Sequence, residues 1–256
     1  MKRSKPAVSD PPAQPAPRLP LVDAARGAAV AMMIAYHFCY DLTHFGFARF
    51  DMLGDWRWIA WRNVIVTAFL LLVGVSLVLA QLGSQRGYWR RLAQVGGCAI
   101  LVSVVSWVMF AERFIYFGIL HFIVAASLLA RPALRLGRWA AVLGLLLIVL
   151  GTQLHWPEMD PRALNWIGFA AHKPPTEDYT PLLPWLGVVL IGIGLAALWQ
   201  RRSFRVTPQL DAAAQRTPRW LGWLGRHSLV AYMLHQPVLM AGLGLVRFAV
   251  DWRLAA

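Results

Sequence analysis

The sequence predicts an all-α protein of the membrane, a polytopic bundle of about seven transmembrane helices with its N-terminus in the cytoplasm. Hydrophobic residues make up 58% of the 256 residues and charged residues only 14%, whereas an average soluble domain is about 25% charged. Apolar runs that approach the roughly 20 residues needed to cross a bilayer recur along almost the whole chain. So few charges cannot cover a soluble protein of this size.

Seven apolar runs define the expected helices. The first run follows a proline-rich tail, and basic loops separate the second from the third, the fourth from the fifth and the sixth from the seventh. Backbone groups in lipid must find partners within their own segment, so each run is expected to be helical. In chain order the runs are 21–45, 64–82, 92–110, 114–130, 139–154, 182–199 and 228–250.

The chain divides into a tail, 1–20, and a single transmembrane domain, 21–256. The tail holds six of the sixteen prolines and four basic residues, and it has no aromatic residue. This composition is typical of disorder, here on the cytoplasmic side. The first run is too long for a signal-peptide core and lacks a cleavage site, so it is expected to remain as an anchor.

The net charge of +13 belongs to one side of the membrane. The tail and the loops 83–91, 131–138 and 200–227 carry sixteen basic and two acidic residues, whereas the opposite side carries eight of each. Basic residues concentrate in cytoplasmic loops of membrane proteins. The excess charge is therefore topological, and nucleic-acid binding is not expected. The membrane is expected to be a bacterial inner membrane.

The first run is the expected site, because ionisable residues inside a span are costly and mark function. It contains Asp23, Arg26, His37, Asp41 and His44. At about 100° per residue, the last four fall within about 60° of one another on one helix face. That face would line a cavity inside the bundle.

The spacing along this helix suggests a chemistry. Eleven residues place His37 about 16 Å beyond Arg26, which suits a long ligand with an anionic head at Arg26 and a reactive end at His37. Asp41 would fix the tautomer of His37, so that the histidine acts as a general base. His44 could be structural, and Asp23 could simply pair with Arg26 at i+3.

These residues resemble a known family. Arg26 and His37 form an Arg-x10-His pattern similar to that of integral-membrane sugar acyltransferases. The segments 23–27 and 32–42 more closely resemble short bacterial members of the heparan-α-glucosaminide N-acetyltransferase catalytic-domain family. Blocks at 116–122, 178–187 and 224–237 extend the resemblance over nearly the whole chain after the tail.

The resemblance implies that an acetyl or similar acyl group passes from cytoplasmic acetyl-CoA to a glycan or amino-sugar acceptor across the membrane. Arg26 would contact the phosphate-bearing end of the donor, and His37 would be the catalytic histidine. In the longer eukaryotic members the histidine lies slightly farther along, so His44 competes with His37. Acetyl-CoA is a co-substrate, and no metal is expected.

Four further residues are expected to bind substrate. His121 and His235 lie within the fourth and seventh runs and could line the cavity or make structural bonds between helices. Asp178 and Tyr179 lie in the longest outer loop, 155–181, which would cover the acceptor. The alternative function is a proton-coupled transporter that uses His37, Asp41 and His44. The sequence lacks the inverted repeats that are typical of such transporters. A structural role and assembly into a homo-oligomer are further alternatives.

Overall fold

The computed structural model describes residues 19–255, and helices alone build its core. The expected tail, 1–20, lies almost entirely outside the described residues. The helices are α1 (Pro20–His44), α2 (Trp56–Gln81), α3 (Gln85–Phe110), η1 (Ala111–Arg113), α4 (Ile119–Leu129), η2 (Pro132–Trp139), α5 (Ala140–Gln153), η3 (Pro157–Met159), α6 (Arg162–Asn165), α7 (Leu182–Arg201), α8 (Pro208–Arg216), α9 (Arg219–Arg226) and α10 (Ser228–Ala255).

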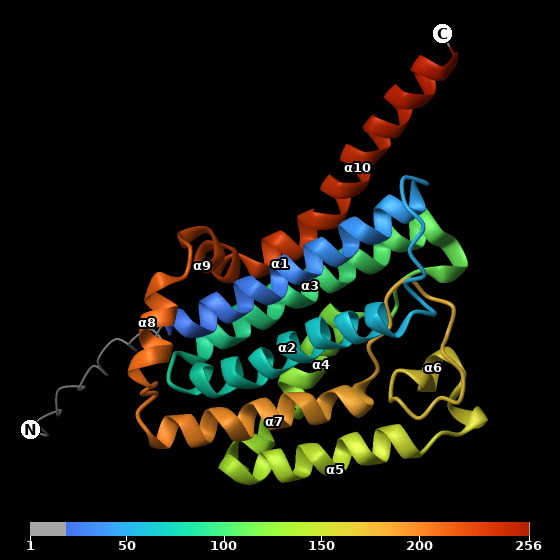
Figure 1. Ribbon diagram of the computed structural model, residues 1–256. Coiled ribbons are helices and arrows are strands. Elements are labelled where there is room, and N and C mark those ends of the chain that lie inside the picture. Colours follow the sequence, from blue (N-terminus) through green and yellow to red (C-terminus); the bar gives the residue numbers. More distant parts are fainter. Residues whose placement is uncertain (1–18, 256) are drawn as a thin grey trace, which may run out of the picture.

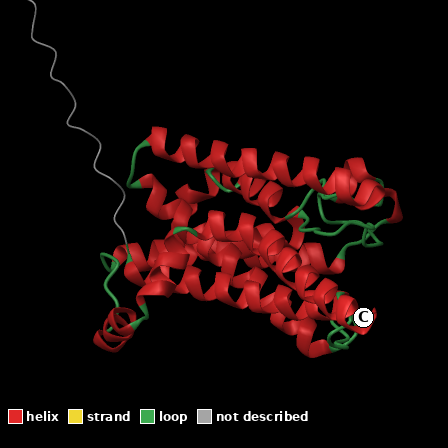
Figure 2. Ribbon diagram, turned by 90° about the horizontal axis from the view of Figure 1, so that it is seen from above, coloured by secondary structure: helices red, strands yellow, loops and turns green. Residues whose placement is uncertain are grey.

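The long helices lie side by side along one direction, and the short elements gather at the two ends of the bundle (Figures 1 and 2). α8 and α9 lie at the end where α1 begins, which we call the α9 end. α6 and the loops around it lie at the opposite end, which we call the α6 end (Figure 1). The all-helical architecture confirms the predicted fold class.

Small residues let the helices approach closely in the half of the bundle built by α2, α5 and α7. A Cβ atom at Gly74 of α2 would collide with the carbonyl oxygen of Val189 on α7, and one at Gly187 of α7 would collide with the carbonyl of Gly144 on α5. Close packing at small residues is the usual basis of helix association in lipid. α7 is therefore held between α2 and α5.

Within the described residues, five helical segments are long and apolar enough to cross a membrane: 56–81, 85–113, 132–153, 182–201 and 228–254. α1 has 25 residues and so the required length, but its polar residues lower its hydropathy. α4 has only 11 residues, about 16 Å of helix against the roughly 30 Å of a bilayer core. The count of seven spans stays a prediction.

The predicted fourth helix was wrong in its first part, because 114–118 is not helical. Hydroxyl groups take over the backbone bonds there: Ser106 Oγ accepts from Ile115 N at 2.9 Å, and Ser103 Oγ donates to Ile115 O at 2.6 Å. Thr176 Oγ1 likewise donates to Phe114 O at 2.8 Å. Non-helical backbone at membrane depth is tolerated where protein surrounds it. As a result, α4 begins inside the bundle.

Four predicted loops are partly helical. α3 already begins at Gln85, within the loop 83–91, and η3 and α6 lie within the loop 155–181. The loop 131–138 forms η2, with a left-handed glycine, Gly137 (φ 56°), near its end. The loop 200–227 contains α8 and α9, and α9 packs against α1 through backbone contacts at Gly27 and Gly225 that leave no room for a Cβ.

α10 leaves the bundle along its length. Its first part packs on α1, and its last contacts there are those of Gly244 and Arg247 with Phe45. Beyond them it projects from the bundle (Figure 1), with Phe248 and Trp252 about 70% exposed. The polar residues of α10 that matter for the site all precede this projection.

Candidate functional site

The polar face of α1 turns inward, as expected from its spacing. The Arg26 side chain is 16% exposed and Asp41 is fully buried, whereas Phe38 and Tyr40, which flank this face on its two sides, are about 40% exposed. His37 is half-buried between them. His44 is exposed and lies edge-on to Phe45.

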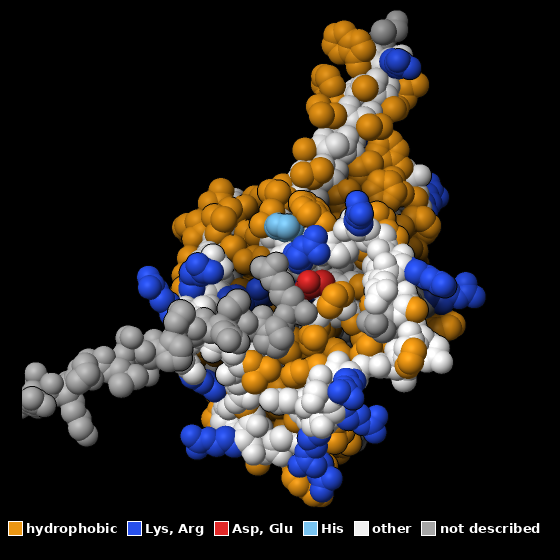
Figure 3. Space-filling view, turned by 90° about the vertical axis from the view of Figure 1, so that its left-hand side faces the viewer, with side chains coloured by type: hydrophobic (Ala, Val, Ile, Leu, Met, Phe, Trp, Pro, Cys, Tyr) orange, Lys and Arg blue, Asp and Glu red, His pale blue; other side chains and the backbone are white. Residues whose placement is uncertain are grey.

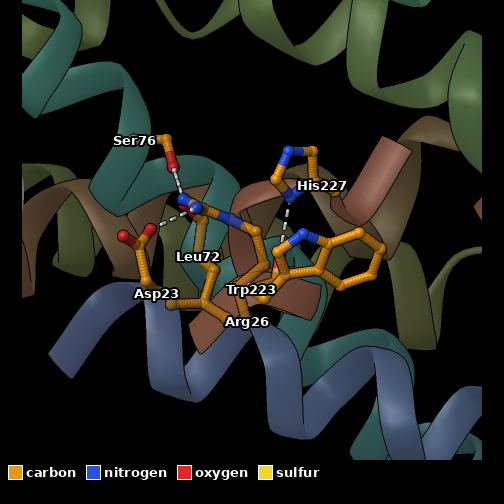
Figure 4. A network of polar contacts seen from close by, with 6 residues as sticks. All are labelled: Asp23, Arg26, Leu72, Ser76, Trp223 and His227. Atoms are coloured by element: carbon orange, nitrogen blue, oxygen red, sulfur yellow. Dashed lines mark hydrogen bonds and ion pairs between the residues drawn. The ribbon is translucent and has the colours of Figure 1, made fainter. Parts of the chain in front are cut away.

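Arg26 forms the first polar centre, at the α9 end. Its guanidinium lies 3.2 Å from an Asp23 carboxylate oxygen and donates to Ser76 Oγ of α2 at 2.9 Å (Figure 4). The Asp23 pair is the one expected from the i+3 spacing. Ser76, which sequence reasoning missed, fixes the guanidinium from a second helix and could have been noticed as a polar residue within an apolar run.

An aromatic pair from the α9 segment lies beside this centre. The rings of Trp223 and His227 stack with centroids 4.7 Å apart, and His227 Nδ1 donates to the Trp223 carbonyl at 2.9 Å (Figure 4). Most of the charged side chains on the surrounding face of the molecule are basic (Figure 3). The α9 end therefore combines fixed positive charge with an aromatic surface.

His37 and His235 form the second polar centre, where α1 meets α10. Their ring centroids are 4.8 Å apart with planes at 80°. His37 Nδ1 lies 2.9 Å from Met33 O, and His235 Nδ1 lies 2.6 Å from Tyr232 O. Because a carbonyl only accepts, both Nδ1 atoms carry the hydrogen, and both Nε2 atoms are left as acceptors in the neutral rings.

The expected hydrogen bond between His37 and Asp41 is wrong. The backbone carbonyl one turn earlier in α1 takes the Nδ1–H of His37, and Asp41 Oδ1 instead accepts from Gln236 Nε2 of α10 at 2.8 Å. Tautomer control thus comes from Met33, and Asp41 joins two helices. Gln236 was missed, although it lies between His235 and Pro237 in a block that the sequence already marked.

Asp178 reaches this second centre from the loop before α7. Its Oδ2 accepts from the Ile119 N–H at the start of α4 at 2.9 Å, and a Cβ at Gly118 would collide with that oxygen. His37 acts electrostatically on this carboxyl, and the carboxyl acts on Tyr232. The three groups therefore lie in one region. Burial raises the pKa of Asp178 above its ordinary value.

His121 lies beside the start of α4 and holds local structure. Its Nε2 lies 3.0 Å from Ser103 Oγ, and its Nδ1 accepts from the Gly118 N–H at 3.3 Å. Both ring nitrogens are thus engaged with protein, which supports the structural alternative for this residue.

Tyr179 points into the loop rather than into the centre. Its hydroxyl donates to Asn165 O at 2.7 Å, and Tyr116 donates to the side chain of the same asparagine at 3.0 Å. Burial, Tyr116 and Asp160 together raise the pKa of Tyr179 to about 12, so its hydroxyl stays protonated. Tyr179 therefore secures the loop that presents Asp178.

A surface depression lies elsewhere, between α2, α3 and η2. It encloses about 190 Å³ and includes neither Arg26 nor His37; its lining residues are Leu77, Ala80, Gln81, Gln85, Tyr88, Arg131 and Leu134. Among residues 19–255, no group of three or more His, Cys, Asp and Glu side chains is placed to hold a metal ion.

The fold and the two polar centres define a multi-pass helical membrane protein with a histidine-containing centre inside its bundle. A family model for the catalytic region of heparan-α-glucosaminide N-acetyltransferase matches residues 18–237. The chain belongs to this family, and membership implies acyltransferase activity. Comparison with curated proteins gives no match, and comparison with solved structures gives none either.

Proposed function

We propose that the protein transfers an acetyl or similar acyl group from acyl-CoA to a hydroxyl or amine of a glycan or amino-sugar acceptor. The observation that carries the proposal is the arrangement of α1, whose inward face holds a fixed guanidinium at one end of the bundle and an imidazole about 16 Å farther along. Family membership supplies the reaction class.

Arg26 receives the phosphate-bearing end of the donor. Asp23 and Ser76 already hold its guanidinium in place, so little side-chain freedom is lost when an anion binds. The α9 end faces the cytoplasm of a bacterial inner membrane in this proposal, in keeping with its basic loops. The extended arm of the donor then runs along α1 toward His37.

His37 is the general base. Met33 fixes its Nδ1–H, so Nε2 can take the proton of the acceptor hydroxyl or amine. The acceptor atom bonds to the thioester carbonyl carbon as the carbon–sulfur bond breaks, and the proton is returned to the thiolate, which leaves as a free thiol. Asp178 and His235 contact the acceptor beside this atom.

The test measures transfer from labelled acetyl-CoA to sugar acceptors by purified protein in detergent. His37→Gln should lower kcat by about 10²–10⁴-fold, the usual contribution of a general base, whereas His44→Gln should stay near wild type. Arg26→Gln should mainly raise KM for the donor. If only His44→Gln abolished acyl transfer, His44 would be the general base instead of His37.

A transporter would give a different pattern. Wild-type protein that neither binds nor turns over any acyl-CoA would refute the proposal. Proton-coupled uptake that depends on His37 in vesicles would then favour transport.

A further inference from the structure

The contact between α1 and α10 contains three buried acceptors without a partner among the described residues. They are Asp41 Oδ2, His235 Nε2 and Gln236 Oε1. A single hydrogen bond crosses the contact at this level, from Gln236 Nε2 to Asp41 Oδ1 at 2.8 Å. Two of the three unpartnered atoms thus belong to the two groups that this bond joins, and buried acceptors normally have donors.

The charge around Asp41 poses the same problem. Its side chain is 0% exposed, and a buried carboxylate needs a cation or several donors. The titratable groups acting on it are His37 and His44 of its own helix, and α10 contributes only the Gln236 amide. Arg247, the nearby cation of α10, is paired with Asp251 at 3.0 Å.

We propose that Asp41 is held as a neutral carboxylic acid and that Gln236 is its positioning residue. A proton on Oδ2 donates to Gln236 Oε1 while Gln236 Nε2 donates to Oδ1, so that acid and amide satisfy each other. This pair gives both unpartnered oxygens a bond and removes the buried charge.

The acid–amide pair, as we call Asp41 with Gln236, fixes α10 against α1 next to the histidines. Gln236 directly follows His235, and Asp41 lies one turn beyond His37. Locking the amide therefore locks the placement of the His235 ring at 4.8 Å from His37. The third unpartnered acceptor, His235 Nε2, remains directed to a donor on the substrate. The activity part of this inference rests on the proposed function; the protonation of Asp41 does not.

Infrared spectroscopy tests the protonation directly. The carbonyl stretch of a protonated carboxyl is separated from carboxylate and amide bands. The spectrum of wild type minus Asp41→Asn, recorded at pH 7 in detergent, should contain this protonated band. A difference spectrum with only carboxylate bands would overturn the proposal whether or not the protein transfers acyl groups.

Kinetics test the positioning role. Asp41→Asn keeps a two-bond pair with Gln236 that needs no proton, so kcat should stay within about threefold of wild type, whereas an Asp→Asn change in a triad that orients a histidine costs about 10⁴-fold. Gln236→Leu should lower kcat at least about tenfold with little change in donor KM.

A swap variant controls for folding. Asp41→Asn combined with Gln236→Glu exchanges amide and acid between the helices, and it should restore most of the kcat lost in Gln236→Leu. The positioning role is refuted if the kcat of folded Asp41→Asn is as low as that of His37→Gln. It is also refuted if the swap variant does not recover the kcat lost in Gln236→Leu. If wild type has no transferase activity, the proposed function fails and the infrared result still decides the protonation.

Discussion

The imidazole rings of His37 and His235 meet edge to face, with centroids 4.8 Å apart, across the contact between α1 and α10. Each ring donates Nδ1–H to a carbonyl of its own helix. In their neutral forms the two rings therefore keep Nε2 as the acceptor. This arrangement is suited to a substrate that brings hydrogen-bond donors.

His235→Asn should separate this role from helix packing. The asparagine amide can replace the Nδ1–H bond to Tyr232 O but offers no acceptor at the Nε2 position. We expect kcat to fall about tenfold or more, with the thermal midpoint nearly unchanged. His172→Asn is the control, because that side chain is 81% exposed in the outer loop. A His235→Asn variant with wild-type kcat would remove His235 from the site.

Ser76→Ala should weaken donor binding. The Ser76 hydroxyl accepts from the Arg26 guanidinium at 2.9 Å, and a hydrogen bond to a charged group contributes about 1.5–3 kcal/mol. We expect KM for acyl-CoA to rise about tenfold at unchanged kcat. Thr152→Ala is a suitable control, since that exposed hydroxyl bonds only to backbone of its own helix. An unchanged KM would contradict a donor-binding Arg26.

Gly118→Ala should destabilise the start of α4. The added Cβ would collide with Asp178 Oδ2 and with Ile115, and overpacking of this kind costs about 1–3 kcal/mol. Gly97→Ala in α3, where the added atom meets nothing within 4 Å, should be neutral or stabilising by up to about 1 kcal/mol. Thermal unfolding in detergent compares the two, and equal midpoints would contradict the tight contact.

Asp178 should make stability depend on pH. Burial raises its folded-state pKa above the ordinary value of about 3.9. Between these two values the folded state keeps a proton that the unfolded state has lost, so stability falls as the pH rises through this window. Asp178→Asn does not ionise, and its advantage in thermal midpoint over wild type should grow from about pH 4 upward.

Asp160→Asn provides the opposite case. Hydrogen bonds from His172 lower the pKa of Asp160, so its stabilising contribution is present above about pH 4 and is lost as the pH falls through the lowered folded value. The thermal midpoint of wild type should therefore rise relative to that of Asp160→Asn as the pH rises. The same pH trend in both variants would refute the assignment of the two shifts.

Much of α1 was predictable because helical periodicity alone decides which of its residues share a face. Arg26, His37 and Asp41 follow that geometry. Their partners were not predictable, because Ser76 and Gln236 lie on helices whose rotation depends on packing. His37 illustrates the difference: the spacing offered Asp41 as a partner, but a carbonyl of the same helix was nearer.

The residue at which α4 begins could not be predicted from the sequence for another reason. The run 114–130 is apolar enough to be read as one helix, and hydropathy does not reveal that Ser103, Ser106 and Thr176 bind its backbone from other segments. The two serines belong to the preceding helix, and Thr176 lies about 60 residues beyond the start of the run. A local pattern cannot report such bonds.

The late start of α4 leaves a helix that is much shorter than a bilayer core. Its 11 residues cover about 16 Å, roughly half of a bilayer core of about 30 Å. The segment before it is not helical, and hydroxyl groups of neighbouring segments bind its backbone. In the proposed reaction the bound donor already holds its acyl group beside His37, so the acceptor needs to reach only this depth of the bundle.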